Sequence, residues 1–147
     1  MTPVFQTINH DPDNNKYGNC MQAVFASMLD LPLDDVPHFM ANNPSVDELW
    51  PIVKSWLATQ GYALFTICFT SRLDDIQYFM KEHNDGIYYI LNGKSPRGFC
   101  HNVIGMGNSI VHDPNPEGGG IIDSWNGYYW IEILVPIADW LAPQKGG

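Results

Sequence analysis

The feature that most restricts the fold of this chain is a change in its hydrophobic pattern near Gly86. Before this point, three segments carry apolar residues at helical spacing, whereas afterwards short apolar stretches alternate with turn residues. Helices followed by antiparallel strands predict an α+β fold, with N-terminal helices packed on a C-terminal antiparallel sheet. The chain has 147 residues, of which 45% are hydrophobic, and no long linker interrupts it. We therefore expect a single domain, residues 1–147.

The expected elements follow from turn residues and helix signals. The predicted helices cover residues 20–29, 45–60 and 71–83, and the predicted strands cover residues 4–8, 62–69, 87–91, 99–106, 109–112 and 128–135. Ser45 and Glu48 match a capping box at the start of the second helix. Pro51 lacks a backbone N–H, so it should kink that helix or mark a second start. Residues 113–120, rich in proline and glycine, are expected to form a loop.

A cysteine stands at the first position of the first predicted helix. Gly18 frees the backbone before it, and Asn19 is a good N-cap because its side-chain oxygen can accept an orphan backbone N–H. The positive end of a helix lowers the pKa of a cysteine, and the thiolate is the reactive form. Free cysteines are usually buried and inert, but the Gly-Asn approach favours an accessible nucleophile at Cys20. The helix buries a stripe formed by Met21, Val24, Phe25 and Met28.

A histidine and an aspartate in the second half are the expected partners of Cys20. His101 lies at the start of a predicted strand, the general layout of Cys–His hydrolases, although a lone histidine there more often faces solvent. Asp113 ends the next strand and would orient the imidazole. A plain turn at residues 107–108 pairs Asn102 with Asp113, which places Asp113 on the wrong face. A bulge is therefore required, and it would set Asp113 opposite His101; the glycines around Met106 favour it.

A second aspartate competes for the third position. Asp123 begins the segment Asp-Ser-Trp-Asn-Gly, which resembles the Asn-Ser-Trp-Gly segment of papain-type peptidases. We favour Asp113, because it ends the strand that neighbours His101, and interpret Asp123 as a turn residue. The sequence leaves the choice between them open.

An acyl-transfer site also needs donors for a developing oxyanion. The backbone N–H of Cys20 is one donor, and the side-chain amide of Gln6 is the predicted second. Asn19 and Gln22 are weaker choices, because one is expected to cap the helix and the other lies within it. The basic residues beside the expected cleft could meet an acidic substrate group, although a charged loop is more often only solvated. The candidate substrate contacts are Asn19, Lys94, Arg97 and Trp125.

Other functions are disfavoured by composition. A net charge of −9 argues against nucleic-acid binding, and no apolar run approaches the ~18 residues of a membrane span. Three cysteines without a C-x-x-C pair predict no disulfide framework and no zinc site, and Cys68 is expected in the core. Cys100 and His101 are adjacent, so on a strand they point to opposite faces. We expect no metal, no cofactor, no secretory signal and a cytoplasmic location.

Several short motifs resemble a known group of proteins. They are Gln6-Thr7, residues 18–23, 26–29, 31–33, 36–39 and 93–98, His101, and residues 112–116. Together they resemble a family of small uncharacterised proteins common in phages and prophages, over most of the chain. The chain is more distantly similar to the papain-like cysteine peptidase superfamily, especially the peptidases that remove double-glycine leader peptides. The resemblance implies a papain-like fold, a Cys20–His101–Asp113 triad and Gln6 in the oxyanion position.

The expected function is a thiol-dependent hydrolase that acts through a thioester. A peptidase, an isopeptidase and a deamidase all fit, with a peptide or protein as substrate, and an amine acceptor would make it a transamidase. The sequence does not select among them, nor does it indicate the oligomeric state. The alternative is a phage-encoded binding protein that inhibits a host defence component in the host cytoplasm. It would use the papain-like shell as a scaffold without catalysis, and its acidic surface would suit a basic partner.

Overall fold

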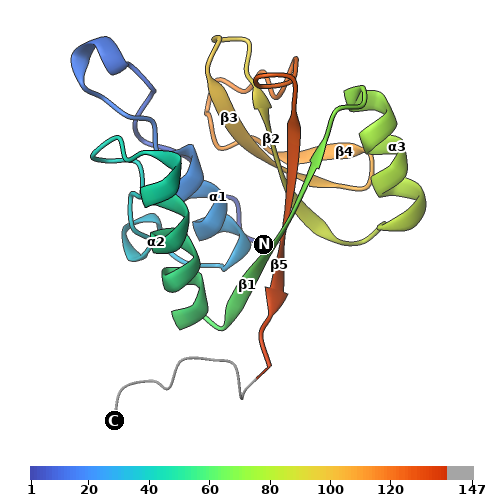
Figure 1. The fold of residues 1–147 in the computed structure, drawn as a ribbon, viewed down its shortest axis with the longest axis horizontal. Helices are drawn as coiled ribbons and strands as arrows, with labels where there is room; N and C mark the ends of the chain where they lie inside the picture. The colour runs from blue at the N-terminus through green and yellow to red at the C-terminus, as the bar shows by residue number, and fades with distance from the viewer. Residues whose placement is uncertain (139–147) are drawn as a thin grey trace.

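The computed structural model describes residues 1–138, and it contains three α-helices and one five-stranded sheet (Figure 1). The α+β class is confirmed, while residues 139–147 of the expected domain lie outside the described part. None of the helices within residues 1–138 combines the length and the apolar character needed to cross a bilayer. The helices are α1 (Cys20–Met28), α2 (Val46–Thr59) and α3 (Leu73–His83), and two 3₁₀ turns, η1 (Pro12–Asn14) and η2 (Leu33–Asp35), flank α1. The strands are β1 (Tyr62–Phe69), β2 (Tyr88–Lys94), β3 (Cys100–Met106), β4 (Ser109–His112) and β5 (Tyr129–Pro136).

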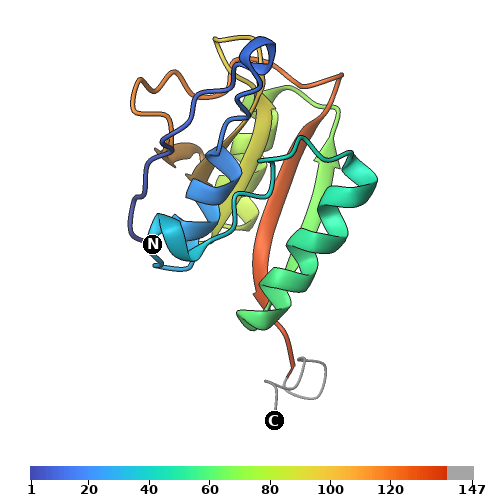
Figure 2. The same cartoon turned by 90° about the vertical axis from the view of Figure 1, so that its left-hand side faces the viewer.

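The sheet is antiparallel throughout, in the order β1-β5-β2-β3-β4. Helices α1 and α2 lie on one face, which is turned toward the viewer in Figure 2, and α3 packs on the other. Because successive strand residues point to opposite faces, the strands feed two separate cores. Ile90 and Ile104 pack with α1 and α2, whereas Tyr89 and Leu91 pack with α3. The cavity described below opens on the face that α1 and α2 cover.

Helices α1 and α2 begin close to their predicted residues, but only one of the two predicted side-chain caps is present. The capping box of α2 is present, because the Ser45 hydroxyl accepts the Glu48 N–H at 3.3 Å and donates to the Glu48 carboxylate at 3.1 Å. Helix α2 continues through Pro51 without a second start. Helix α1 begins at Cys20 as predicted, but the side chain of Asn19 does not cap it. The predicted side-chain cap is therefore wrong.

The strand predicted at residues 4–8 does not form. Its backbone groups find other partners: Val4 donates to the Ser27 hydroxyl at 2.9 Å, and Gln6 donates to the Pro114 carbonyl at 2.8 Å. These bonds hold the segment against α1 and the loop after β4, so it does not join the sheet. A difference of the opposite kind occurs in β2, which extends to Lys94 beyond its predicted end and pairs with the start of β3.

The β3–β4 hairpin is irregular, as the triad requires. Met106 pairs with Ser109 beside the turn, but Ile104 pairs with His112, so one extra residue, Val111, lies on β4. The predicted pairing of His101 with Asp113 needed the extra residue on β3 and is wrong. Gly105 stays in the ladder, and its missing side chain makes room for the Tyr89 ring, which a Cβ at this position would strike. A one-residue shift of either sign changes the parity, so Asp113 still turns toward the face of His101.

Candidate active site

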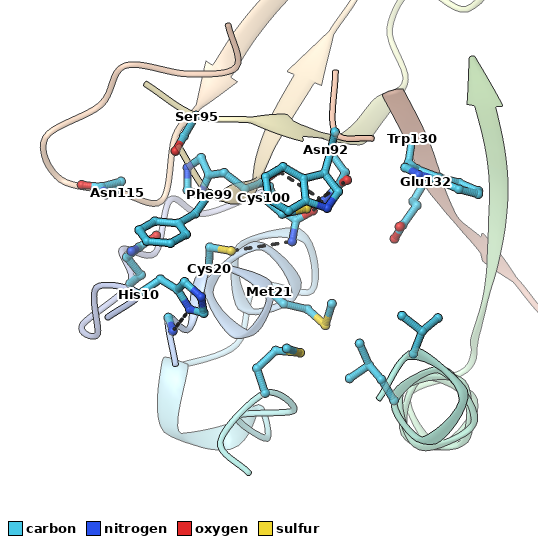
Figure 3. A pocket seen from close by; sticks show the side chains of 18 of the residues that line it. His10, Cys20, Met21, Asn92, Ser95, Phe99, Cys100, Asn115, Trp130 and Glu132 are labelled. Atoms are coloured by element: carbon cyan, nitrogen blue, oxygen red, sulfur yellow. Dashed lines mark hydrogen bonds between the residues drawn. The ribbon is translucent and has the colours of Figure 1, made fainter. Parts of the chain in front are cut away.

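Cys20 lies where the start of α1 meets β3, in the close-up of Figure 3. Its sulfur accepts a hydrogen bond from the side-chain amide of Asn102 at 3.7 Å. The Asn102 side chain is fixed in turn by Asn92, whose side-chain amide donates to Oδ1 of Asn102 at 3.0 Å. The thiol is partly buried, so the groups of β3 rather than bulk water make up most of its surroundings. The sequence did not indicate Asn92 or Asn102, since their role depends on how α1 docks on the sheet.

His101 and Asp113 form a direct pair. The Nε2 atom of His101 lies 2.8 Å from Oδ1 of Asp113, and both side chains are largely buried. The carboxylate is fixed by the backbone N–H groups of Asn115 and Gly120, each at 2.9 Å. Since the Asp113 carboxylate accepts a hydrogen bond from Nε2–H, the other ring nitrogen, Nδ1, is left for Cys20. The loop after β4 thus presents a carboxylate that sets the orientation of the imidazole.

Each of the three residues shifts the pKa of its neighbour toward the charged form. Burial alone would raise the pKa of Cys20, but the hydrogen bond and positive charge of His101, with Asn102, lower the pKa below its ordinary value. Burial would lower the pKa of His101, yet Asp113 and Cys20 raise it to about 9. The pKa of Asp113 falls despite burial, because His101 and two backbone N–H groups favour the carboxylate. The arrangement therefore favours the thiolate of Cys20 and the charged form of His101 relative to the isolated side chains.

Asp123, the competing aspartate, lies elsewhere. Its carboxylate accepts the N–H of Ser124 at 2.7 Å, and its backbone carbonyl accepts the N–H of Lys94 at 2.8 Å. It is exposed, and instead of forming the expected turn it pairs with Lys94 in an isolated β-bridge. The structure brings Asp113, and not Asp123, to His101.

Two candidate oxyanion donors face the same region. The backbone N–H of Cys20 has no hydrogen-bond partner within residues 1–138, as expected at a helix start. Gln6 is buried and lines the cavity beside Cys20, where its sequence position predicted it. Its amide nitrogen, however, donates to the Ile8 carbonyl at 3.2 Å, and its Oε1 is buried without a partner. Gln6 is in place, but its donor is engaged by its own loop.

Asn19 holds this loop against the helix instead of contacting a substrate. Its side chain is 2% exposed and does not line the cavity. Its oxygen accepts the backbone N–H groups of Thr7 and Ile8 at 2.9 and 2.8 Å, and its nitrogen donates to Gln22 at 3.1 Å. The asparagine is thus a clamp that fixes Gln6 next to Cys20, which explains why its side chain is unavailable as a cap.

Of the three remaining predicted substrate contacts, two line the cavity and one does not. Arg97 and Trp125 line the cavity, and Arg97 also donates to the Gly118 carbonyl at 2.8 Å. Lys94, the last residue of β2, does not line it. The sequence therefore placed two of these three residues at the site.

The cavity itself has a volume of about 770 Å³ and lies between the sheet and the two helices on its face. Met21, Met40 and Trp50 supply apolar walls on the helix side. Trp130 and Glu132, which sequence reasoning missed, line it from β5. The signal available was the charged Glu132 within an otherwise apolar strand. Within residues 1–138 no three or more His, Cys, Asp or Glu side chains cluster in a way that could hold a metal ion.

The other two cysteines differ from Cys20. Cys68 is exposed, so its expected place in the core is wrong. Cys100 lines the cavity, and its sulfur contacts the Asn92 amide at 3.1 Å. Loss of water around the thiol, together with the nearby charges of Cys20 and Glu132, raises the pKa of Cys100 to about 11. Cys20 is thus the cysteine whose surroundings favour the thiolate.

Comparisons with protein-family models, with curated proteins and with solved structures gave no match to this chain.

Proposed function

We propose that the protein is a papain-like thiol hydrolase that cleaves an amide bond of a peptide or protein through a thioester. The observation that carries this proposal is the linked set Cys20–His101–Asp113, in which the pKa of the thiol is lowered and that of the imidazole is raised to about 9. A buried cysteine with a purely structural role would have a raised pKa. A helix-start cysteine beside a histidine of an antiparallel sheet is also the arrangement that suggests the papain-like comparison.

In the first half of the reaction, the Cys20 thiolate attacks the substrate carbonyl carbon. A C–S bond forms and the carbonyl electron pair moves onto oxygen. The free N–H of Cys20 donates to that oxyanion, and Gln6 becomes the second donor when its amide leaves the Ile8 carbonyl. The oxyanion then collapses, the C–N bond breaks, and His101 gives its proton to the leaving amine.

In the second half, a water molecule attacks the thioester. Neutral His101 takes a proton from this water, and the collapse of the second oxyanion releases the acid and the Cys20 thiolate. Asp113 keeps the imidazole in one orientation and stabilises its charged form throughout. An amine in place of water would give transamidation by the same steps, and a glutamine side chain as the acyl donor would give deamidation.

The test is selective labelling of Cys20 with iodoacetamide at mildly acidic pH, followed by intact-mass detection of the adduct. We expect one adduct, located on Cys20, and its loss in Cys20→Ala with unchanged circular dichroism. Cys68→Ala serves as the matched control, because that cysteine is exposed and outside the site. Equal labelling of Cys68 or Cys100 would contradict an activated Cys20. An activated peptide ester should then leave an acyl adduct on the wild-type protein and none on Cys20→Ala.

A further inference from the structure

Glu132 occupies an unusual position in the middle of the sheet. It lies on β5 between β1 and β2, opposite Thr66 and Ile90, on the face that α1 and α2 cover. Its side chain is only 6% exposed. No hydrogen bond or ion pair reaches its carboxylate from any residue within 1–138, and no other charged side chain lies on β5. A buried carboxylate without a partner is costly, so its presence calls for an explanation.

The carboxylate is directed into the cavity that contains Cys20. Figure 3 shows the Glu132 side chain beside Trp130, extending from β5 into the open space between the sheet and the helices. The opposite wall is formed by apolar side chains of α1 and α2, among them Met21, Leu49 and Trp50. The cavity thus combines apolar walls with an acidic group and a thiol in one space.

The other charges around this cavity do not neutralise Glu132. Lys54 of α2 lines it but does not approach the carboxylate within ion-pair distance. Arg97 also lines the cavity, but its guanidinium donates to the Gly118 carbonyl and forms no ion pair with Glu132. Cys20 and His101 line the cavity as a hydrogen-bonded pair. Burial raises the pKa of Glu132 to about 7, so both protonation states of its carboxyl group are populated near neutral pH. A bound cation would stabilise the ionised form and lower this pKa.

We propose that this cavity selects substrates with a cationic, aliphatic side chain next to the reacting carbonyl, the apolar walls holding the methylenes and Glu132 pairing with the charge. The proposal rests on the proposed reaction at Cys20 and deepens it by naming the substrate class: lysine- or arginine-bearing peptides. Long basic side chains match such a site because they bury an apolar stem while keeping a charged end paired. The negative charge of Glu132 also acts on the Cys100 thiol, because it contributes to the raised pKa of Cys100.

The experiment compares two reagents that both alkylate Cys20. One is a series of iodoacetamides carrying an alkyl chain with a terminal ammonium group, and the other is the same series ending in methyl. We expect the best ammonium reagent to alkylate Cys20 about ten-fold faster than its methyl isostere near pH 8, a ratio that corresponds to one ion pair in a poorly solvated site. The ratio should shrink toward about pH 5 as Glu132 takes up a proton while the amine stays charged.

Glu132→Gln keeps the shape of the side chain and removes its charge, so it should bring the ratio to about one. Glu82→Gln is the matched control, because Glu82 is exposed on α3 behind the sheet and should leave the ratio unchanged. A wild-type ratio near one at every chain length and pH would overturn the proposal. So would an unchanged ratio in Glu132→Gln, which would assign the preference to another charge.

The ratio is independent of how strongly Cys20 is activated, since both reagents use the same thiol. Failure of the proposed reaction would show as slow alkylation of Cys20 by plain iodoacetamide at mildly acidic pH. Failure of the cation site would show as a ratio near one with rapid plain alkylation. The two results are therefore distinguishable in one set of measurements.

Discussion

Two cysteines line the same cavity, and their surroundings shift the pKa of the two thiols in opposite directions. Cys20 stands at a helix start beside His101, and its pKa is lowered. Cys100 begins a strand beside the neutral Asn92 amide, and its pKa is raised to about 11. Cys100 is the more exposed of the two residues, and burial acts to raise the pKa of both thiols, so burial alone does not separate them. The difference shows that a nearby imidazolium determines which of the two thiols ionises.

Removal of the imidazole should have the largest effect on this contrast. In His101→Ala the pKa of Cys20 loses its main lowering influence, and we expect alkylation near pH 6.5 to slow by about 10- to 100-fold. The rate at Cys100 should stay within about two-fold, because His101 contributes little to its surroundings. The measurement is peptide-resolved mass spectrometry of the alkylated protein. His83→Ala, an exposed histidine on α3, is the control, and an equal loss there would argue against a specific role.

Removal of the carboxylate should have a smaller effect of the same sign. In Asp113→Asn the imidazole keeps its position next to Cys20 but loses its charged partner, so its pKa falls and less imidazolium is present near pH 7. We expect Cys20 alkylation to slow by about ten-fold. Asp123→Asn is the matched control, and it should change the rate little because the exposed Asp123 carboxylate accepts from Ser124 and not from His101. A larger loss for Asp123→Asn would give that residue the third position instead.

The Asn102 amide should contribute less than either. Its nitrogen lies 3.7 Å from the Cys20 sulfur, so the bond is long and weak. Asn102→Ala should slow Cys20 alkylation by about two- to five-fold, as expected for one neutral donor. Asn92→Ala tests the same network from the other end, since it removes the group that supports Asn102 and contacts Cys100. A loss as large as that of His101→Ala would make the amide, and not the imidazole, the main stabiliser.

The smallest expected effect is that of the Cys20 charge on the alkylation rate of Cys100. The negative charge of the Cys20 thiolate helps to raise the pKa of Cys100, so Cys20→Ala should lower that pKa slightly. We expect Cys100 alkylation near pH 9 to accelerate by about two-fold. No acceleration would mean that Cys20 is uncharged in the wild-type protein at that pH.

Local features of the fold were readable from the sequence. The start of α1 at Cys20 and the full extent of β1 are as predicted, because turn residues and apolar spacing act over a few positions. The separation of a helix-start cysteine and a strand-start histidine also pointed to the two residues that the structure brings together. These are the cases in which chemistry and spacing agree at one position.

Features that depend on packing were not readable. The side chain of Asn19 has the correct type for a cap, but it finds stronger partners in the loop at residues 7–8. The bulge lies on β4, while Gly105 of β3 stays paired and leaves space for the ring of Tyr89, a contact between residues far apart in sequence. In the sequence, Glu132 reads as a solvent-facing residue of an ordinary strand. Only the packing of α2 on that face of the sheet shows that the position is covered (Figure 1). Long-range contacts of this kind leave no local pattern.

The most direct test of the account is the pH profile of alkylation at Cys20 and Cys100 in one wild-type sample. Because the folded-state pKa of Cys20 is lowered and that of His101 is raised to about 9, the Cys20 thiolate should persist down to mildly acidic pH. Cys100, with its pKa near 11, should react appreciably only in strongly alkaline solution. We expect Cys20 to react about 100-fold faster than Cys100 near pH 6.5. Parallel profiles for the two cysteines, both rising only above about pH 8.5, would contradict the account.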